Sequence, residues 1–120
     1  MTDITFRDLG VRADLADTLA ADGKTHPFPI QRDTLPDSLA GRDVLGRGRT
    51  GSGKTIAFSL PLVQRLAAAS TRTEPNRPRG LVLAPTRELA TQIAATIEPL
   101  AREAGLTVTT IFGGVKQTRQ

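Results

Sequence analysis

The amino-acid sequence predicts an α/β fold in which helices flank a small parallel sheet. Three short apolar segments, residues 44–45, 81–84 and 107–112, alternate with segments whose apolar residues recur at helical spacing. Strands that alternate with helices favour right-handed βαβ units, and these units build a parallel sheet. Three strands make a small sheet for such a fold, so we expect the sheet to be incomplete.

The composition is typical of a soluble globular protein. The chain has 120 residues, of which 38% are hydrophobic and 23% are charged. No apolar run reaches the roughly 18 to 20 residues that span a bilayer, and the first six residues lack the features of a secretory leader. We therefore expect a cytoplasmic protein with no membrane partner. The absence of cysteine excludes disulfides and thiolate metal sites.

The charge balance indicates a polyanionic partner. Sixteen Lys and Arg residues against twelve Asp and Glu residues give a net charge of +4, although a basic soluble surface would explain the same number. The chain has no Trp or Tyr and only four Phe. A nucleic acid would thus be held by its backbone rather than by stacking of its bases.

The first forty residues predict a helical region. Leu15 and Leu19 recur at helical spacing within residues 8–22, and Gly23 is a stop signal. Residues 24–29 hold two prolines and predict a loop. A short helix over residues 30–40 then places Leu35 and Leu39 on one face. We expect residues 1–40 and 41–120 to be two parts of one structural unit.

Two longer helices are expected in the second part. The first begins at Lys54 and has apolar residues at Phe58, Leu62 and Leu66. The second is capped by Thr86, and its apolar residues are Leu89, Ile93, Ile97 and Leu100. The polar segment 71–80 between them contains three arginines. We predict a solvated surface loop, and a contact with RNA is the less favoured alternative.

A glycine-rich segment fits the phosphate-loop pattern GxxxxGK(S/T). It runs from Gly48 to Gly53, Lys54 and Thr55, between a predicted strand and a predicted helix. Glycines let consecutive backbone N–H groups point inward, and the helix adds its positive end. Lys54 would reach the β- and γ-phosphates, and the Thr55 hydroxyl would bind Mg²⁺. A chance glycine-rich turn is the alternative, but the strand–loop–helix context favours nucleotide binding.

The acidic residue that hydrolysis needs is not found at the predicted strand ends. Phosphate-loop enzymes hold Mg²⁺ with a carboxylate that usually ends a second buried strand. Residues 81–84 run into Pro85, and residues 107–112 run into Gly113. The sequence thus predicts a phosphate cradle without the carboxylate that would complete it.

Several short motifs resemble those of the DEAD-box ATP-dependent RNA helicases. The segments 48–55 (GRTGSGKT), 85–90 (PTRELA) and 113–114 (GG) are similar in order and spacing to motif I, motif Ia and the GG motif. The segment 27–31 (PFPIQ) resembles the end of the Q motif, and Phe6 lies 17 residues before Gly23, like the family's isolated aromatic. The resemblance extends from Phe6 to Gln120 and implies a P-loop NTPase fold of the RecA-like type.

The resemblance also implies roles for individual residues. Gln31 would read the adenine edge, and Lys54 and Thr55 would be the catalytic residues, with Thr55 as the Mg²⁺ ligand. The nucleotide would be bound by Phe6, Gln31, Arg49, Thr50, Gly51, Ser52, Gly53, Lys54 and Thr55. The RNA backbone would be contacted by Pro85, Thr86, Arg87, Gly113 and Gly114.

Three positions depart from the family pattern. Lys24 follows Gly23 where an aromatic is usual, Phe28 occupies the place of Thr or Ser, and Arg49 replaces Gln in motif I. The first two changes bear on how adenine would be packed. Arg49 adds a charge beside the phosphate cradle.

The resemblance implies a parent protein that uses ATP and Mg²⁺ to separate RNA duplexes. Its DEAD and SAT motifs and its second RecA-like domain would follow Gln120, so we expect the present 120 residues to neither hydrolyse ATP nor unwind RNA. A non-catalytic module that binds nucleotide or RNA, or a truncated product without function, stays an alternative. A different phosphate-loop enzyme such as a nucleotide kinase is disfavoured by the PTRELA and Q-like segments.

Overall fold

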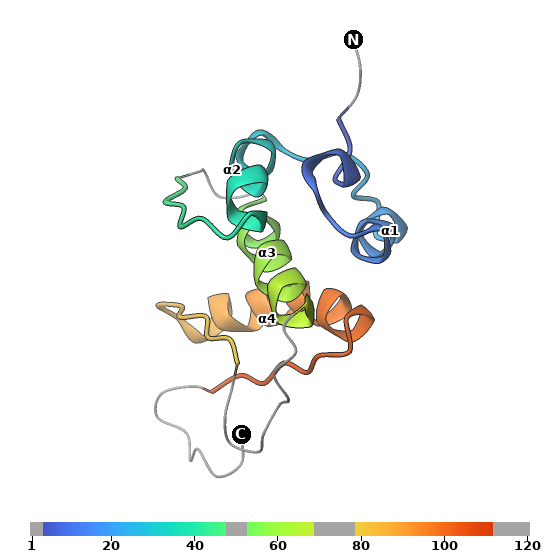
Figure 1. Ribbon diagram of the computed structural model, residues 1–120. Coiled ribbons are helices and arrows are strands. Elements are labelled where there is room, and N and C mark those ends of the chain that lie inside the picture. The colour runs from blue at the N-terminus through green and yellow to red at the C-terminus, as the bar shows by residue number, and fades with distance from the viewer. Residues whose placement is uncertain (1–3, 48–52, 69–78, 112–120) are drawn as a thin grey trace.

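The computed structural model describes residues 4–47, 53–68 and 79–111 and shows a layered arrangement of helices (Figure 1). The elements are a 3₁₀-helix and four α-helices: η1 (Arg7–Leu9), α1 (Ala13–Ala21), α2 (Pro29–Leu39), α3 (Lys54–Ala68) and α4 (Arg87–Glu103). α3 packs against both α2 and α4, α1 contacts α4, and η1 contacts α2. Among the described residues, no helix has the length and apolar content needed to cross a membrane.

One hydrophobic core joins these helices. Each α-helix contributes a leucine that is at most 1% exposed: Leu15, Leu35, Leu60 and Leu100. Burial of a leucine side chain stabilises a fold by about 1.5–3 kcal/mol. Phe6 and Val11, from the N-terminal segment, belong to the same cluster. Apolar burial therefore holds the segment before α1 against the rest of the protein.

The first predicted helix is divided in the structure. Gly10 has a φ of 102°, in the left-handed region, and it ends η1 by donating its N–H to the Arg7 carbonyl at 3.1 Å. α1 then begins at Ala13, so the prediction of one helix over residues 8–22 was wrong at its start. The predicted end is confirmed, because α1 stops at Ala21 and the Lys24 N–H turns back to the Leu19 carbonyl at 2.8 Å.

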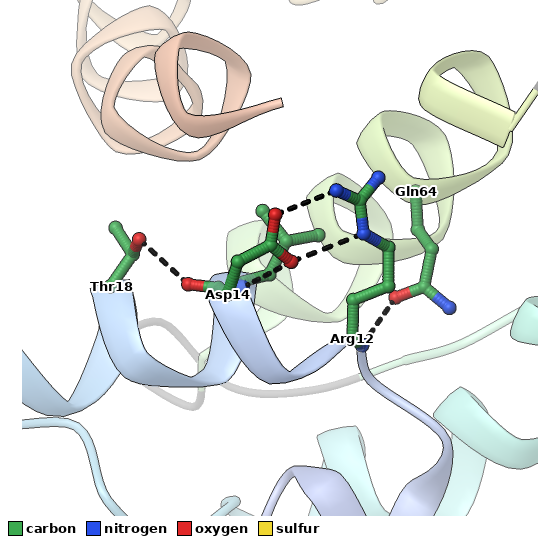
Figure 2. Close-up of polar contacts among 5 residues, drawn as sticks. Arg12, Asp14, Thr18 and Gln64 are labelled. Carbon is green, nitrogen blue, oxygen red and sulfur yellow. Dashed lines mark hydrogen bonds and ion pairs between the residues drawn. The ribbon is translucent and has the colours of Figure 1, made fainter. Parts of the chain in front are cut away.

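Gln64 of α3 fixes the connection between η1 and α1 (Figure 2). Its Oε1 accepts the Arg12 backbone N–H at 2.9 Å, and its Nε2 donates to the Gly10 carbonyl at 3.0 Å. The Arg12 guanidinium lies against the Asp14 carboxylate, with N–O distances of 3.1 and 2.6 Å, and the Thr18 hydroxyl donates to the Asp14 carbonyl. One side-chain amide thus holds the N-terminal segment to the second half of α3.

The predictions of α2 and α4 are confirmed, and the buried face of α3 differs from the prediction. Phe58, expected on the apolar face, is 38% exposed, and the buried positions include Ile56, Leu60 and Val63. α3 packs against both α2 and α4, and its buried residues also include Ala57, Ser59 and Pro61, so burial is not confined to one stripe. The spacing of apolar residues along the sequence predicts one buried stripe and cannot predict burial on a wider part of the helix surface.

The expected sheet is not present among the described residues, none of which is in a strand. The segments predicted as buried strands contain residues that are largely open to solvent; Leu45 is 93% exposed and Leu83 is 84% exposed. A strand exists only where a neighbouring strand accepts and donates its backbone hydrogen bonds, and these segments show no such pairing. The prediction of three buried parallel strands is therefore not confirmed for the described parts of 44–45, 81–84 and 107–112, and it stays a prediction.

Surface charges contribute little to this fold. The pairs Arg42–Asp37 and Arg102–Glu98 lie at 2.9 and 2.7 Å, and all four side chains are exposed. The pKa of the Asp8 carboxyl is held below its ordinary value by the backbone N–H of Thr5, which donates to it at 2.9 Å, and by the Thr5 side chain. The apolar core, and not ion pairing, accounts for the packing of the helices.

Candidate functional site

α3 begins at a glycine with an unusual backbone conformation. Gly53 has a φ of 86°, which disfavours residues with a Cβ atom, and it immediately precedes Lys54, the first residue of α3. Its carbonyl accepts the Ala57 N–H at 3.1 Å as a first hydrogen bond of the helix. The last glycine of the phosphate-loop pattern therefore makes the turn into the helix, as the pattern requires.

A glutamine from α2 reaches this turn. Gln31 Nε2 donates to the Gly53 carbonyl at 3.0 Å, and Gln31 Oε1 accepts the Phe28 backbone N–H at 2.8 Å. The side chain is 4% exposed, so both of its polar groups are matched inside the protein. The two contacts join the start of α2 to the start of α3, which are 22 residues apart in sequence.

Two side chains lie so close to Gly53 that a Cβ atom there would collide with them. A Cβ atom added to Gly53 would lie 2.3 Å from Gln31 Nε2 and 2.9 Å from Phe28 Cδ2. Both distances are shorter than nonbonded contact allows. A residue other than glycine at position 53 would displace one of these side chains in addition to straining its own backbone.

The nucleotide-binding residues predicted from the sequence are distributed unevenly. Lys54 is exposed and Thr55 is half-buried in the first turn of α3, next to Gly53 and close to Gln31. The structure thus gathers Gln31, Gly53, Lys54 and Thr55 at one end of α3. Four further predicted residues lie outside the described residues: Arg49, Thr50, Gly51 and Ser52.

Phe6 lies in a different environment from these residues. It is 3% exposed and packs in the hydrophobic core. Core packing alone accounts for an aromatic residue at position 6, and its contact with nucleotide stays a prediction.

The predicted RNA-binding residues lie at the start of α4. Pro85, Thr86 and Arg87 are all exposed. Thr86 has extended backbone angles, and its Oγ1 accepts the Leu89 N–H at 3.1 Å, which confirms the predicted helix cap. Gly113 and Gly114 lie outside the described residues.

The chemistry of the site at the start of α3 fits an anion. Backbone N–H groups and the positive end of a helix favour negative charge, and the exposed Lys54 side chain adds a cation. Within residues 4–47, 53–68 and 79–111, no group of three or more His, Asp and Glu side chains could hold a metal ion. The Thr55 hydroxyl alone would be an incomplete Mg²⁺ site, since Mg²⁺ is usually bound by carboxylates together with phosphate oxygens.

Sequence reasoning missed two features of this site. The hydrogen bond from Gln31 to Gly53 and the approach of the Phe28 ring to Gly53 both depend on how α2 packs against α3. A partial signal existed, because the spacing of Phe28 and Gln31 is that of a capping box, in which a Gln at the third helical position accepts from the backbone of the cap residue.

The comparisons with known proteins identify the family of this chain. A model of the DEAD/DEAH box helicase family matches residues 28–120, which include the start of α2, the start of α3 and the start of α4. The chain belongs to the DEAD/DEAH box helicase family.

Individual DEAD-box relatives are longer than this chain. It is 47% identical over 111 residues to the ATP-dependent RNA helicase DeaD of Escherichia coli K12, covering 92% of this chain and 17% of that protein. It is similar in structure to the RNA helicase Prp28 of Chaetomium thermophilum bound to ADP, with a TM-score of 0.86, 38% identity, and coverage of 100% of this chain and 29% of that one. The chain spans less than a third of the length of either protein.

A further similar structure contains both RNA and a nucleotide. The chain is 30% identical to S. cerevisiae Dbp5 bound to RNA and ADP BeF₃, with a TM-score of 0.64 over 82% of this chain and 25% of that one. These neighbours share the fold that the resemblance implies. The described residues of the present chain form helices, and none of them is in a strand.

Proposed function

We propose that the whole protein is an ATP-dependent RNA helicase, and that this chain supplies its adenine contact, its phosphate loop and part of its RNA surface. The observation that carries the proposal is the hydrogen bond from Gln31 Nε2 to the Gly53 carbonyl at 3.0 Å. It sets a side chain that can recognise a base beside a loop that can hold phosphates. The family and the nucleotide-bound and RNA-bound relatives support the same assignment.

Gln31 retains the hydrogen-bonding capacity that adenine needs. Its amide has two N–H donors and two acceptor lone pairs, of which one of each is used by Gly53 and Phe28. The remaining N–H matches adenine N7, and the remaining lone pair matches the adenine N6 amino group. Gln31 would thus hold the loop and read the base at the same time.

The residues at the start of α3 would bind the phosphates. Residues 49–55 would surround them with backbone N–H groups, and the Lys54 ammonium would neutralise the β- and γ-phosphates. Mg²⁺, when bound with ATP, would offset phosphate charge, and the Thr55 hydroxyl would be one of its ligands. The carboxylate that completes such a site is not among the residues identified here, so we propose that this chain alone binds ATP without hydrolysing it.

The start of α4 would contact RNA. Pro85, Thr86 and Arg87 are exposed there, and the N-terminus of α4 favours phosphate through its N–H groups and its dipole. Gly113 and Gly114 would complete this surface. Contacts of this kind hold the backbone and carry no sequence information, so binding would be independent of RNA sequence and weakened by salt.

Titration calorimetry of the 120-residue chain with Mg-ATP tests the proposal. We expect saturable binding that falls by at least about tenfold in Lys54→Ala, because a charge-assisted contact to phosphate is lost. Phosphate release with and without RNA is measured in parallel, and we expect none above background. Equal ATP affinity in the Lys54→Ala variant would contradict the assignment of the loop, and turnover that depends on Lys54 would contradict the absence of hydrolysis.

A further inference from the structure

Phe28 is an exposed aromatic residue beside the candidate phosphate loop. It is 51% exposed, more than Phe6 in the core and more than Phe58 on α3. Its Cδ2 lies 2.9 Å from the position that a Cβ on Gly53 would occupy. The edge of the ring therefore covers the glycine that begins α3, while about half of the side chain faces solvent.

The backbone of Phe28 is fixed from both sides. Its N–H is bound by Gln31 Oε1 at 2.8 Å, and Pro29 follows it, which restricts Phe28 to the extended conformation that it has (φ −73°, ψ 162°). The Phe28 backbone therefore does not have to be ordered when a ligand packs against the ring. The ring is an apolar surface next to Gly53 and the polar start of α3.

Helix capping does not explain an aromatic residue at this position. Phe28 is the N-cap of α2, and its side chain has no oxygen that could accept a backbone N–H. Thr86, at the N-cap of α4, makes such a hydrogen bond to the Leu89 N–H. Position 28 therefore lacks a stabilising contact that the same chain uses elsewhere.

We infer that the Phe28 ring is the surface on which the nucleobase stacks, with the phosphates at the start of α3 and the base edge at Gln31. The inference rests on the proposed nucleotide binding and goes beyond it by dividing base recognition between two residues. Phe28 contacts the face of the base, which every nucleobase has, and Gln31 contacts the edge, which differs between bases. Phe28 would therefore set affinity for any nucleoside triphosphate, and only Gln31 would set the preference for adenine.

The test measures the affinities of Phe28→Ala for Mg-ATP, Mg-GTP and inorganic tripolyphosphate by calorimetry. Loss of one base–aromatic stack lowers affinity by about 5- to 150-fold. We expect ATP and GTP to weaken by the same factor and tripolyphosphate, which has no base, to bind as in the unsubstituted chain. Phe58→Ala removes a partly exposed ring of α3 and is the matched control, for which all three affinities should be unchanged.

Phe28→Thr keeps the test informative if Phe28→Ala folds poorly. Threonine supplies the missing N-cap oxygen, so α2 should be at least as stable as in the unsubstituted chain, whereas the ring is still absent. ATP affinity within twofold of the unsubstituted chain in Phe28→Thr would overturn the inference. An equal loss for tripolyphosphate would also overturn it, because the ring would then shape the loop rather than stack on a base. If the unsubstituted chain bound tripolyphosphate as tightly as ATP and GTP, only the inference about Phe28 would fail. If it bound neither tripolyphosphate nor the nucleotides, the proposed function would fail as well.

Discussion

The two ends of α3 are each held by a glutamine amide, and the two amides lie in different surroundings. At the start of the helix, Gln31 of α2 links the Phe28 N–H and the Gly53 carbonyl. In the second half of the helix, Gln64 accepts the Arg12 N–H (Figure 2) and donates to the Gly10 carbonyl. In each amide the oxygen accepts a backbone N–H and the nitrogen donates to a backbone carbonyl.

The side chains of Gln31 and Gln64 differ in how far they are buried and in the residues around them. Gln31 is 4% exposed and adjoins a glycine loop and an exposed lysine, whereas Gln64 is partly exposed and holds a short connection at the protein surface. The same amide chemistry therefore serves a site at one end of α3 and the tethering of a chain segment at the other. Substitutions at the start of α3 should affect both stability and nucleotide binding, and those at its other end only stability.

Gly53→Ala should produce the largest loss of stability. The left-handed backbone costs a residue with a Cβ about 1–2 kcal/mol, and displacement of the Gln31 amide costs about 1–3 kcal/mol more. We expect the free energy of unfolding in urea to fall by about 2–5 kcal/mol. Gly105→Ala is the control, because Gly105 also has a positive φ but no atom within 4 Å of its Cβ position. Equal losses in the two variants would show that the start of α3 is not crowded.

Gln31→Leu and Gln64→Leu compare the two amides directly. Leucine has a similar shape but cannot form hydrogen bonds, so Gln31→Leu leaves the Phe28 N–H and the Gly53 carbonyl without the side-chain partner that is part-buried with them. We expect a loss of about 2 kcal/mol for Gln31→Leu and about 1 kcal/mol for Gln64→Leu, whose backbone partners are near solvent. Chemical denaturation measures both. A larger loss of unfolding free energy in Gln64→Leu than in Gln31→Leu would contradict the expectation that the Gln31 amide contributes more to stability.

Thr86→Ala should cost less, because α4 relies on its own cap and not on a residue from another helix. The hydrogen bond from the Leu89 N–H to Thr86 Oγ1 is lost, and we expect the free energy of unfolding to fall by about 1 kcal/mol. Thr86→Asp retains an acceptor and adds a negative charge to the helix start. It should unfold like the unsubstituted chain but bind single-stranded RNA more weakly in a filter assay. Unchanged RNA binding by Thr86→Asp would count against an RNA surface at this helix start.

Ser59→Ala should have the smallest effect, and it should be stabilising. Ser59 lies in the middle of α3, fully buried, and its Oγ has no hydrogen-bond partner among the described residues. Alanine removes this polar group and has a higher helix propensity, so we expect a gain of about 0.5–1 kcal/mol. Ser38→Ala in α2 removes a hydroxyl that donates to the Thr34 carbonyl at 3.0 Å and should give no such gain. A loss of stability in Ser59→Ala, measured by thermal unfolding, would show that the hydroxyl has a partner.

The helices were predictable because their signals are local. Leu15 and Leu19 mark one face of α1, Gly23 marks its end, and Thr86 marks the start of α4; all of these agree with the structure. The strands were not predictable in the same way, because an apolar segment such as 81–84 becomes a strand only when another segment pairs with it. Leu45 and Leu83 are largely exposed, and the sheet stays a prediction.

The candidate site was predictable in its residues but not in its contacts. The pattern around Lys54 and the family resemblance indicated a phosphate loop with Gln31 as its base contact. That Gln31 holds Gly53 itself, and that the Phe28 ring covers the same glycine, follows from the packing of α2 on α3 across 22 residues of sequence. Gln64 carried no motif, and only the three-dimensional contacts show its role.

The most direct test of the account observes both amides in one experiment. The side-chain NH₂ resonances of Gln31 and Gln64 are assigned in a ¹⁵N-labelled sample by their disappearance in Gln31→Leu and Gln64→Leu, and Mg-ATP is then added. We expect the Gln31 resonances to shift with ATP concentration and to saturate, because this amide adjoins the loop and retains a donor and an acceptor for adenine, while the Gln64 resonances stay in place. Saturating shifts at Gln64, or none at Gln31 while ATP binds, would contradict a nucleotide site at the start of α3.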